Sequence, residues 1–273
     1  MEKINDYLRI RIEDLENNPT TRVAICLCLD VSGSMASVEG GNIVFTGRKI
    51  VIDGKEAEIV TGGRSRLDEL QEGIKLFYES IMNDKYSRNA AEICVVTFDD
   101  EAKCLVDFAN VYRQKMPVLK VGGITSMGEG VNLALDLLEQ RKGEFKAKGV
   151  SYHQPWLVLM TDGEPNGNET VLRQAMARTM QMINDKKLTL FPIGIGKDAN
   201  LATLAKFTPK KNAIKLRGVN FKDMFEWLSA SVEQISKSMT GEAVNVNPKA
   251  INKWGEKYSL NTGKTEPWPD ELP

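Results

Sequence analysis

The feature that most constrains the fold is a set of short, almost continuous apolar runs rich in β-branched and bulky side chains. The runs are Val23 to Leu29, Ile93 to Phe98, Trp156 to Met160 and Leu188 to Ile195. None has the alternation of apolar and polar residues that marks a strand with one face in water. We therefore expect strands that are covered on both faces, which is typical of a largely parallel sheet.

Segments with helical periodicity lie between these runs. Apolar residues recur at intervals of three or four over 67–81, 131–138, 172–183 and 221–239. Strands that alternate with such helices form βαβ units. The sequence thus predicts an α/β fold, with a doubly wound, mostly parallel central sheet flanked by helices. In such folds ligands bind in the loops beyond the carboxyl ends of the strands.

Three segments fall outside this alternation. Residues 36–64 contain short strands at 42–45, 48–52 and 56–60 around an Asp53-Gly54 turn, which predicts a β-hairpin insert after the first strand. The C-terminal tail, 241–273, has no periodicity but contains Trp254 and Trp268, so we expect it to dock partly on the body. Residues 1–19 form an N-terminal extension with a short helix or an edge strand over 4–15. The main domain then spans 20–240.

The composition excludes several classes of protein. A net charge of -1 gives no overall attraction to nucleic acid or to an acidic membrane, and no apolar run approaches the roughly 20 residues of a membrane-spanning helix. The polar start does not resemble a signal peptide, so we expect a cytoplasmic protein with reduced thiols. Cys26, Cys28 and Cys94 lie in apolar runs, and Cys104 lies ten residues after Cys94. This is not the paired spacing of a zinc site, and we expect buried, inert thiols.

Oxygen-bearing side chains gather at three places where strands end or helices begin. The residues are Asp30, Ser32 and Ser34 after the first apolar run, Thr125 after a Gly122-Gly123 turn, and Asp162 after the third run. Because the carboxyl ends of parallel strands meet at one edge of a sheet, we expect these five side chains to surround one divalent cation. Hard oxygen ligands suit Mg²⁺, Mn²⁺ or Ca²⁺, and Mg²⁺ is the ion expected in a cytoplasm.

These motifs resemble, in order and spacing, the metal-ion-dependent adhesion site (MIDAS) of von Willebrand factor type A (VWA) domains. The resemblance covers about residues 20–240 and, in the segments 156–163 and 191–196, is nearest to bacterial TerY-type proteins of tellurium-resistance and stress operons. It implies that Ser32, Ser34 and Thr125 bind the cation directly, and that Asp30 and Asp162 bind it directly or through water. The remaining position is left to water or to a partner's carboxylate. The insert departs from the family pattern and could cover part of the ion.

Two classes of function remain open. The first is a non-enzymatic, metal-dependent module that binds an Asp or Glu of a protein partner through the cation. The second is a Mg²⁺-dependent phosphoesterase or phosphotransferase. We favour the first, because the motifs have no histidine beside them and no phosphate-cradling lysine loop. The resemblance implies a partner such as a kinase or phosphatase of the same operon, in a stress-response, signalling or phage-defence assembly, with neither nucleic acid nor membrane as partner.

Overall fold

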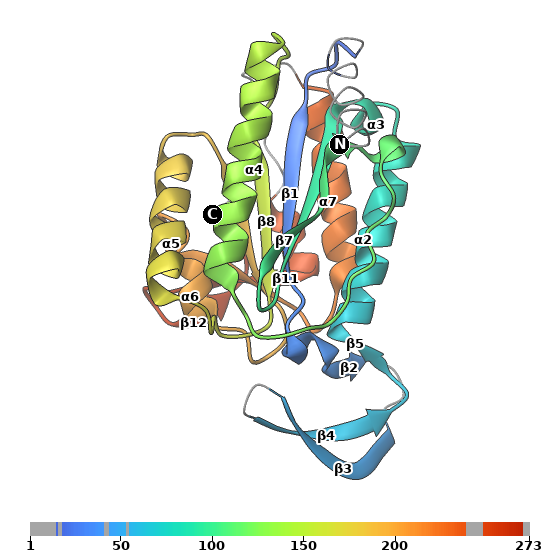
Figure 1. Ribbon diagram of the computed structural model, residues 1–273, viewed down its shortest axis with the longest axis vertical. Coiled ribbons are helices and arrows are strands. Elements are labelled where there is room, and N and C mark those ends of the chain that lie inside the picture. Colours follow the sequence, from blue (N-terminus) through green and yellow to red (C-terminus); the bar gives the residue numbers. More distant parts are fainter. Residues whose placement is uncertain (1–14, 16–17, 41–43, 53–54, 239–247, 270–273) are drawn as a thin grey trace, which may run out of the picture.

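A large mixed sheet runs through the part of the chain that the computed structural model describes, which is Leu15 and residues 18–40, 44–52, 55–238 and 248–269 (Figure 1). The strand order is β12-β11-β10-β9-β8-β1-β6-β7. The parallel strands are β1 (Val23–Asp30), β6 (Ala91–Phe98), β8 (Trp156–Thr161), β9 (Thr189–Gly194) and β10 (Asn212–Leu216). The antiparallel strands at the edges are β7 (Ala102–Asn110), β11 (Gly255–Ser259) and β12 (Lys264–Glu266). The expected α/β fold with a mostly parallel central sheet is confirmed.

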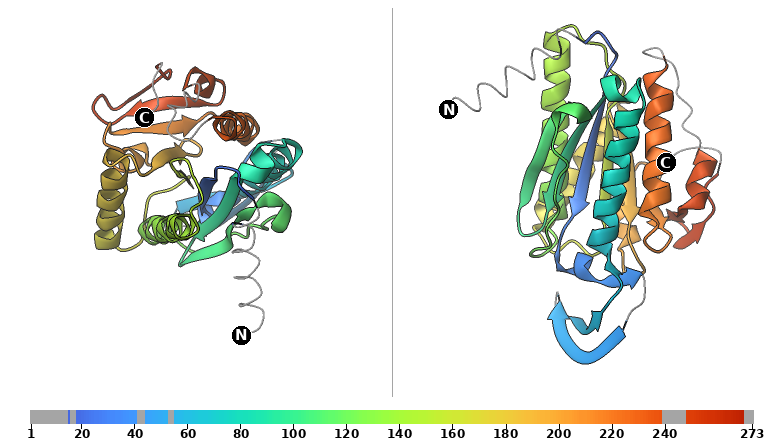
Figure 2. Two further views of the ribbon diagram at one scale, coloured as in Figure 1. Left: turned by 90° about the horizontal axis from the view of Figure 1, so that it is seen from above. Right: turned by 90° about the vertical axis from the view of Figure 1, so that its right-hand side faces the viewer.

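Helices cover both faces of this sheet (Figure 2). The helices α2 (Arg66–Asn83) and α7 (Phe221–Ser236) lie on one face, and α4 (Met127–Ala147) and α5 (Glu169–Asn184) lie on the other. The helices α2, α4 and α5 each contain one of the periodic segments of the sequence, and α7 covers 221–236 of the fourth, whose last residue, 239, lies outside the described residues. Shorter helical segments occupy the connections: η1 (Gly33–Ala36), α3 (Ser87–Ala90), η2 (Val111–Arg113), α6 (Leu201–Ala205) and η3 (Pro248–Lys253).

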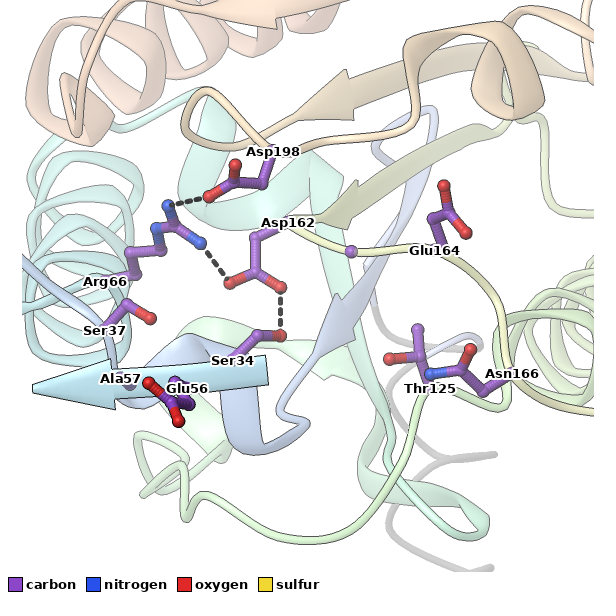
Figure 3. A pocket seen from close by; sticks show the side chains of 11 residues that line it. Ser34, Ser37, Glu56, Ala57, Arg66, Thr125, Asp162, Glu164, Asn166 and Asp198 are labelled. Carbon is purple, nitrogen blue, oxygen red and sulfur yellow. Dashed lines mark hydrogen bonds and ion pairs between the residues drawn. The ribbon is translucent and has the colours of Figure 1, made fainter. Parts of the chain in front are cut away.

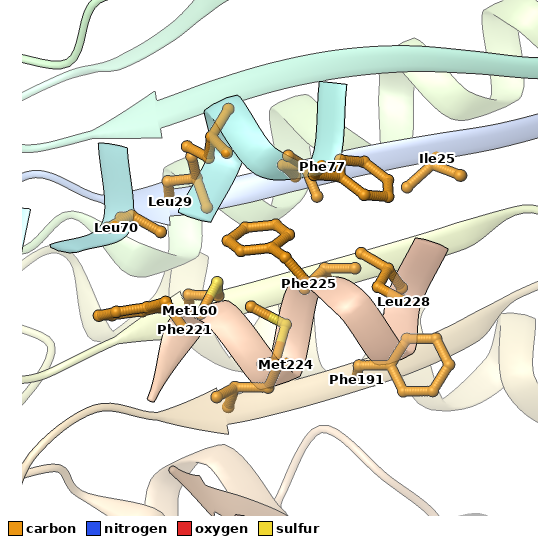
Figure 4. Packing of buried hydrophobic residues seen from close by; sticks show 14 of the residues in the cluster. Ile25, Leu29, Leu70, Phe77, Met160, Phe191, Phe221, Met224, Phe225 and Leu228 are labelled. Carbon is orange, nitrogen blue, oxygen red and sulfur yellow. The ribbon is translucent and has the colours of Figure 1, made fainter. Parts of the chain in front are cut away.

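The core consists of two apolar clusters, one between each face of the sheet and its helices. Along β1, Ile25 and Leu29 face α2 and α7 (Figure 4). Cys26 and Cys28 face α4 on the other side of the sheet. Phe77 of α2 and Phe225 of α7 pack with their ring centroids 5.5 Å apart. Burial on both faces is the reason that β1 has no polar alternation. In the described part of the chain, every helix is too short or too polar to cross a lipid bilayer.

The insert after β1 has a base and a projecting hairpin. At the base, β2 (Val38–Gly40) pairs with β5 (Arg64–Ser65). Beyond it, β3 (Val44–Ile52) pairs with β4 (Lys55–Thr61), and the two project from the carboxyl-end edge of the sheet (Figure 2). The expectation of two strands over 42–52 is corrected, because β3 continues through a bulge between Phe45 and Arg48, where Gly47 has a φ of 73°. The Asp53-Gly54 turn lies outside the described residues.

Excision of the projecting hairpin should leave the body folded. Phe45 is 68% exposed and Val51 is 69% exposed, so their removal takes little apolar area from the core. Replacing residues 44–61 with a short Gly/Ser linker should change the free energy of unfolding by about 1 kcal/mol or less. The wider excision of 37–63 also removes Glu39, which pairs with Arg66, and should cost more. Urea unfolding followed by circular dichroism measures both, and loss of a cooperative transition in the smaller excision would place the hairpin in the core.

The C-terminal segment extends the sheet. The strand β11 pairs antiparallel with β10 over Asn212 to Leu216, and Trp254 and Trp268 are 0% and 3% exposed. Trp254 packs against Trp227 of α7 with ring centroids 5.4 Å apart. We expected the tail 241–273 to dock only partly on the body. Within 248–269 it instead adds strands to the central sheet and buries both tryptophans. Except for Leu15, the expected helix or strand over 4–15 lies outside the described residues.

The edge strand β7 corrects the expectation of four buried thiols. Cys26, Cys28 and Cys94 are buried, but Cys104 is exposed on β7. The apolar pattern of residues 102–110 is too weak to mark this strand, because β7 has a neighbour on one side only and much of it is in contact with water. The antiparallel return from β6 to β7 was therefore missed.

Candidate functional site

The carboxyl ends of three neighbouring strands form the candidate site. In the sheet, β1 has β6 on one side and β8 on the other. The chain therefore adds strands first on the β6 side of β1 and then on the β8 side, so the strand order changes direction at β1. Such a switch in strand order opens a crevice at the carboxyl ends of the strands. Asp30 ends β1 and Asp162 directly follows β8, and both are buried.

A continuous set of hydrogen bonds links most of the predicted donors. The backbone N–H of Ser32 donates to Oδ1 of Asp30 at 2.9 Å, and the hydroxyl groups of Ser32 and Ser34 lie 3.1 Å apart. Ser34 Oγ then donates to Oδ1 of Asp162 at 2.6 Å. Thr161, the last residue of β8, donates its hydroxyl to the other oxygen of Asp30. The structure thus brings Asp30, Ser32, Ser34 and Asp162 into one polar cluster.

Thr125 joins this cluster through its loop. The N–H of Gly122 donates to the carbonyl of Val31 at 2.8 Å, and the N–H of Gly33 donates to the carbonyl of Gly123 at 3.1 Å. A Cβ atom placed on Gly163 would lie 3.7 Å from both Ser34 Oγ and Thr125 Oγ1, so both hydroxyl groups border the same small space. Figure 3 shows the Thr125 hydroxyl pointing toward that space. Ser34 and Thr125 therefore border one space at the sheet edge, and Asp162, Ser32 and Asp30 join them through the hydrogen bonds described above.

Two acidic residues after β6 hold the Thr125 loop, and sequence reasoning missed them. The N–H of Ile124 donates to Oδ1 of Asp100 at 2.9 Å. A Cβ atom on Gly122 would lie 2.8 Å from Oδ2 of Asp99, and one on Gly123 would lie 2.3 Å from Cγ of Asp100, so a side chain at either position would displace these carboxylates, and Gly123 also has a φ of 37°. A signal existed, because Asp99 and Asp100 follow a buried apolar run as Asp30 does. These contacts explain why the turn needs two glycines.

A buried arginine beside Asp162 is a second feature that the sequence did not reveal. Arg66 opens α2, is 3% exposed, and donates through Nη1 to Oδ2 of Asp162 at 2.7 Å. Its guanidinium group also pairs with Glu39 from the base of the insert and lies 3.7 Å from Oδ2 of Asp198. Arg66 therefore pairs with Oδ2 of Asp162, whereas Oδ1 of Asp162 faces Ser34 and the other proposed ligands. No local pattern marks this contact, because 96 residues separate its two ends.

The site carries more negative charge than the protein itself neutralises. Burial and the nearby charge of Asp162 raise the pKa of Asp30 to about 7. Arg66 balances Asp162, but it is shared with Glu39. A divalent cation among the five donors would favour the ionised form of both aspartates. Two carboxylates and three hydroxyl groups fit a hard cation such as Mg²⁺, Mn²⁺ or Ca²⁺.

A cavity of about 390 Å³ opens directly over these donors (Figure 3). The body contributes Ser34, Thr125 and Asp162 to its wall. Glu56 and Ala57 of β4 form another part of the wall, so the hairpin overhangs the site. The space above the donors is therefore bounded by the insert, as its position in the sequence led us to expect.

Comparison with known proteins identifies the fold and its family. The family model for the von Willebrand factor type A domain matches residues 25–165. No curated protein sequence matches the chain. The pilus adhesin SpaC from Lactobacillus rhamnosus GG is 14% identical over 79% of this chain and 31% of its own, with a TM-score of 0.52. The PilB minor pilin from Streptococcus sanguinis is 14% identical over 79% and 62%, with a TM-score of 0.50.

A third structure, proximal thread matrix protein 1 from the mussel byssus with a zinc-occupied MIDAS motif, is 16% identical over 78% of this chain and 48% of its own. Its TM-score is 0.47. This chain thus spans less than two thirds of the length of each of these proteins. At such low identities, the matches with SpaC and PilB show a shared fold.

Proposed function

Since the chain belongs to the von Willebrand factor type A domain family, we propose that it is a metal-dependent protein-binding module whose cation holds a carboxylate of the partner. VWA domains commonly mediate metal-dependent protein interactions through a MIDAS, and the VWA part of the sequence resemblance is confirmed. The observation that carries the proposal is the convergence of three hydroxyl groups and two buried carboxylates below one cavity.

In this proposal Ser32, Ser34 and Thr125 bind the cation directly, and Asp30 and Asp162 bind it directly or through water. Mg²⁺ is the proposed ion, since every donor is a hard oxygen. The aspartates match the charge of a divalent ion, and Arg66 reduces the negative charge of Asp162. The bound ion therefore retains attraction for an anionic oxygen, which an Asp or Glu of a partner supplies. When bound, the cation provides a Lewis-acidic anchor for that carboxylate.

The charges around the cavity argue against the alternative of a phosphoesterase or phosphotransferase. A transferred phosphoryl group needs cationic groups to bind its oxygens. Among the described residues that line the cavity, Arg66 is the one basic side chain, and it already pairs with Asp162 and Glu39. The carboxylates of Glu56, Glu164 and Asp198 also line the cavity, and they would repel a phosphate, with about two negative charges, more strongly than a partner carboxylate with one. A protein carboxylate held by the cation alone fits these surroundings better.

The proposed partner is a protein of a bacterial stress-response, signalling or phage-defence assembly, such as a kinase or phosphatase of the same operon. This finer assignment rests on the sequence resemblance of residues 156–163 and 191–196 to TerY-type proteins, and the comparisons with known proteins add no support to it. A cytoplasmic location is part of the proposal.

Chelation of the cation should release the partner without unfolding the module. Affinity capture from the native host, with the chain as bait, should retain the partner in Mg²⁺ and lose it in EDTA. Thr125→Ala removes one proposed ligand and should weaken the partner complex at least about tenfold, or about 1.4 kcal/mol. The core clusters remain intact, so circular dichroism should still show the folded chain.

The matched control is Ser37→Ala, because Ser37 lines the same cavity but is not among the proposed ligands. This variant should retain the partner. Equal capture in Mg²⁺, in EDTA and with Thr125→Ala would show that the cation does not hold the partner, and the proposed function would then be wrong.

A further inference from the structure

Two neighbouring strands, β6 and β7, bring two thiols and a carboxylate together away from the aspartate and serine site. Sγ of Cys94, Sγ of Cys104 and a carboxylate oxygen of Asp107 all lie within 4.8 Å of one another. Cys94 is buried in β6, Cys104 is exposed on β7, and Asp107 is half-buried on the same strand. Cys26 of β1 is the register neighbour of Cys94 and is hydrogen-bonded to it.

Two bulges in β7 produce this arrangement. Ile93 pairs with Ala109, Val95 with Val106 and Val96 with Cys104, so β7 has one extra residue in each interval. In a regular strand Cys104 and Asp107, three positions apart, would point to opposite faces. The bulges turn both toward the face that Cys94 occupies, the face covered by α4. Bulges are enriched beside functional sites because they re-aim side chains in this way.

We propose that Cys94, Cys104 and Asp107 bind a thiophilic cation such as Zn²⁺, at a site separate from the one under the hairpin. Zinc takes thiolate sulfur at about 2.3 Å and carboxylate oxygen at about 2.0–2.2 Å, so ligands around one ion lie about 3.5–3.8 Å apart. The three donor atoms lie within 4.8 Å of one another, so a closer approach of at most about 1.3 Å by side-chain rotation would bring them into this range. Two sulfur donors select against Mg²⁺ and Ca²⁺, which prefer oxygen.

The position of the cluster suits entry of an ion. The strand β7 is at the edge of the sheet, and the exposed Cys104 gives a path from solvent. The hydrogen bond with Cys104 lowers the pKa of the Cys94 thiol, but the hydrogen bond with Cys26 and burial together raise this pKa well above its ordinary value. Binding of the cation would therefore displace protons from the thiols. Three protein ligands would leave the fourth coordination position of a tetrahedral zinc ion to water or to an external ligand.

Cadmium titration of the full chain tests this site, with Mg²⁺ in excess and a reductant that is not a thiol. We expect a thiolate-to-cadmium charge-transfer absorption that saturates at one equivalent. Cys104→Ser should weaken cadmium binding by more than the about 10–100-fold that loss of an outer-shell partner costs. Because Cys104 is exposed, this variant should fold. Asp107→Asn should weaken binding and keep the absorption.

The variant Asp30→Asn separates this site from the proposed function, on which the inference does not depend. Asp30→Asn should leave the thiolate-to-cadmium absorption unchanged, because Asp30 is not part of the cluster of Cys94, Cys104 and Asp107. The inference is overturned if the wild-type chain gives no such absorption, if Cys104→Ser leaves the affinity unaltered, or if Asp30→Asn abolishes the signal.

Discussion

The variant Glu92→Gln should lose about 3–5 kcal/mol of folding stability, which is the cost of removing one partner from a buried ion pair. Glu92 lies fully buried on β6, where Arg141 of α4 donates to its two oxygens at 2.6 and 2.8 Å. Nε of Arg22 lies 3.4 Å from the same carboxylate. A neutral amide at position 92 would remove the negative charge that the guanidinium groups of Arg22 and Arg141 both face. Urea unfolding of the two proteins measures the difference.

The control for this prediction is Glu144→Gln. Glu144 pairs with Arg141 at 2.5 Å, but its side chain is 28% exposed. Water can replace much of this interaction, so the loss should be about 1 kcal/mol or less. If the two variants were equally stable, the Arg22, Glu92 and Arg141 cluster would not be an important part of the fold's stability.

Millimolar Mg²⁺ should raise the melting temperature of the chain, and Asp30→Asn should abolish this rise. A ligand that binds only the folded state stabilises it by about 2.7 kcal/mol at a concentration 100 times its Kd. For a domain of this size that corresponds to a shift of about 5–10 °C. The amide oxygen of Asn can still accept the hydrogen bond from the N–H of Ser32, so the variant should fold without the ion. Calorimetry with and without Mg²⁺ measures both effects.

Asp198→Asn is the matched control for the Mg²⁺ response. Asp198 lines the same cavity and lies 3.7 Å from Arg66, but it is not a proposed ligand. This variant should show the full rise in melting temperature. An undiminished rise in Asp30→Asn would mean that the ion binds elsewhere. Repeating the scan with Mn²⁺ and Ca²⁺ identifies the preferred ion.

Most of the candidate site could be predicted from the sequence because its parts are local. Asp30, Ser32 and Ser34 lie within one turn of chain after an apolar strand, and Asp162 follows another such strand. The charges around them could not be predicted in this way. Arg66 and Asp162 are 96 residues apart, and the contact exists only because α2 begins beside the end of β8. The overhang of Glu56 above the site likewise depends on the direction in which the hairpin leaves the body.

The sequence by itself determined four of the five parallel strands, the four long helices, the insert and the grouping of the five oxygen donors, but not the strand β10. The physical reason is that burial on two faces and helical amphipathicity are written in neighbouring residues. Tertiary structure alone decided the pairing of β11 with β10 and the meeting of Cys94, Cys104 and Asp107. Both depend on the register between strands, and a shift of one residue in register turns every side chain to the other face. Register is set by contacts among distant segments, which a linear pattern does not record.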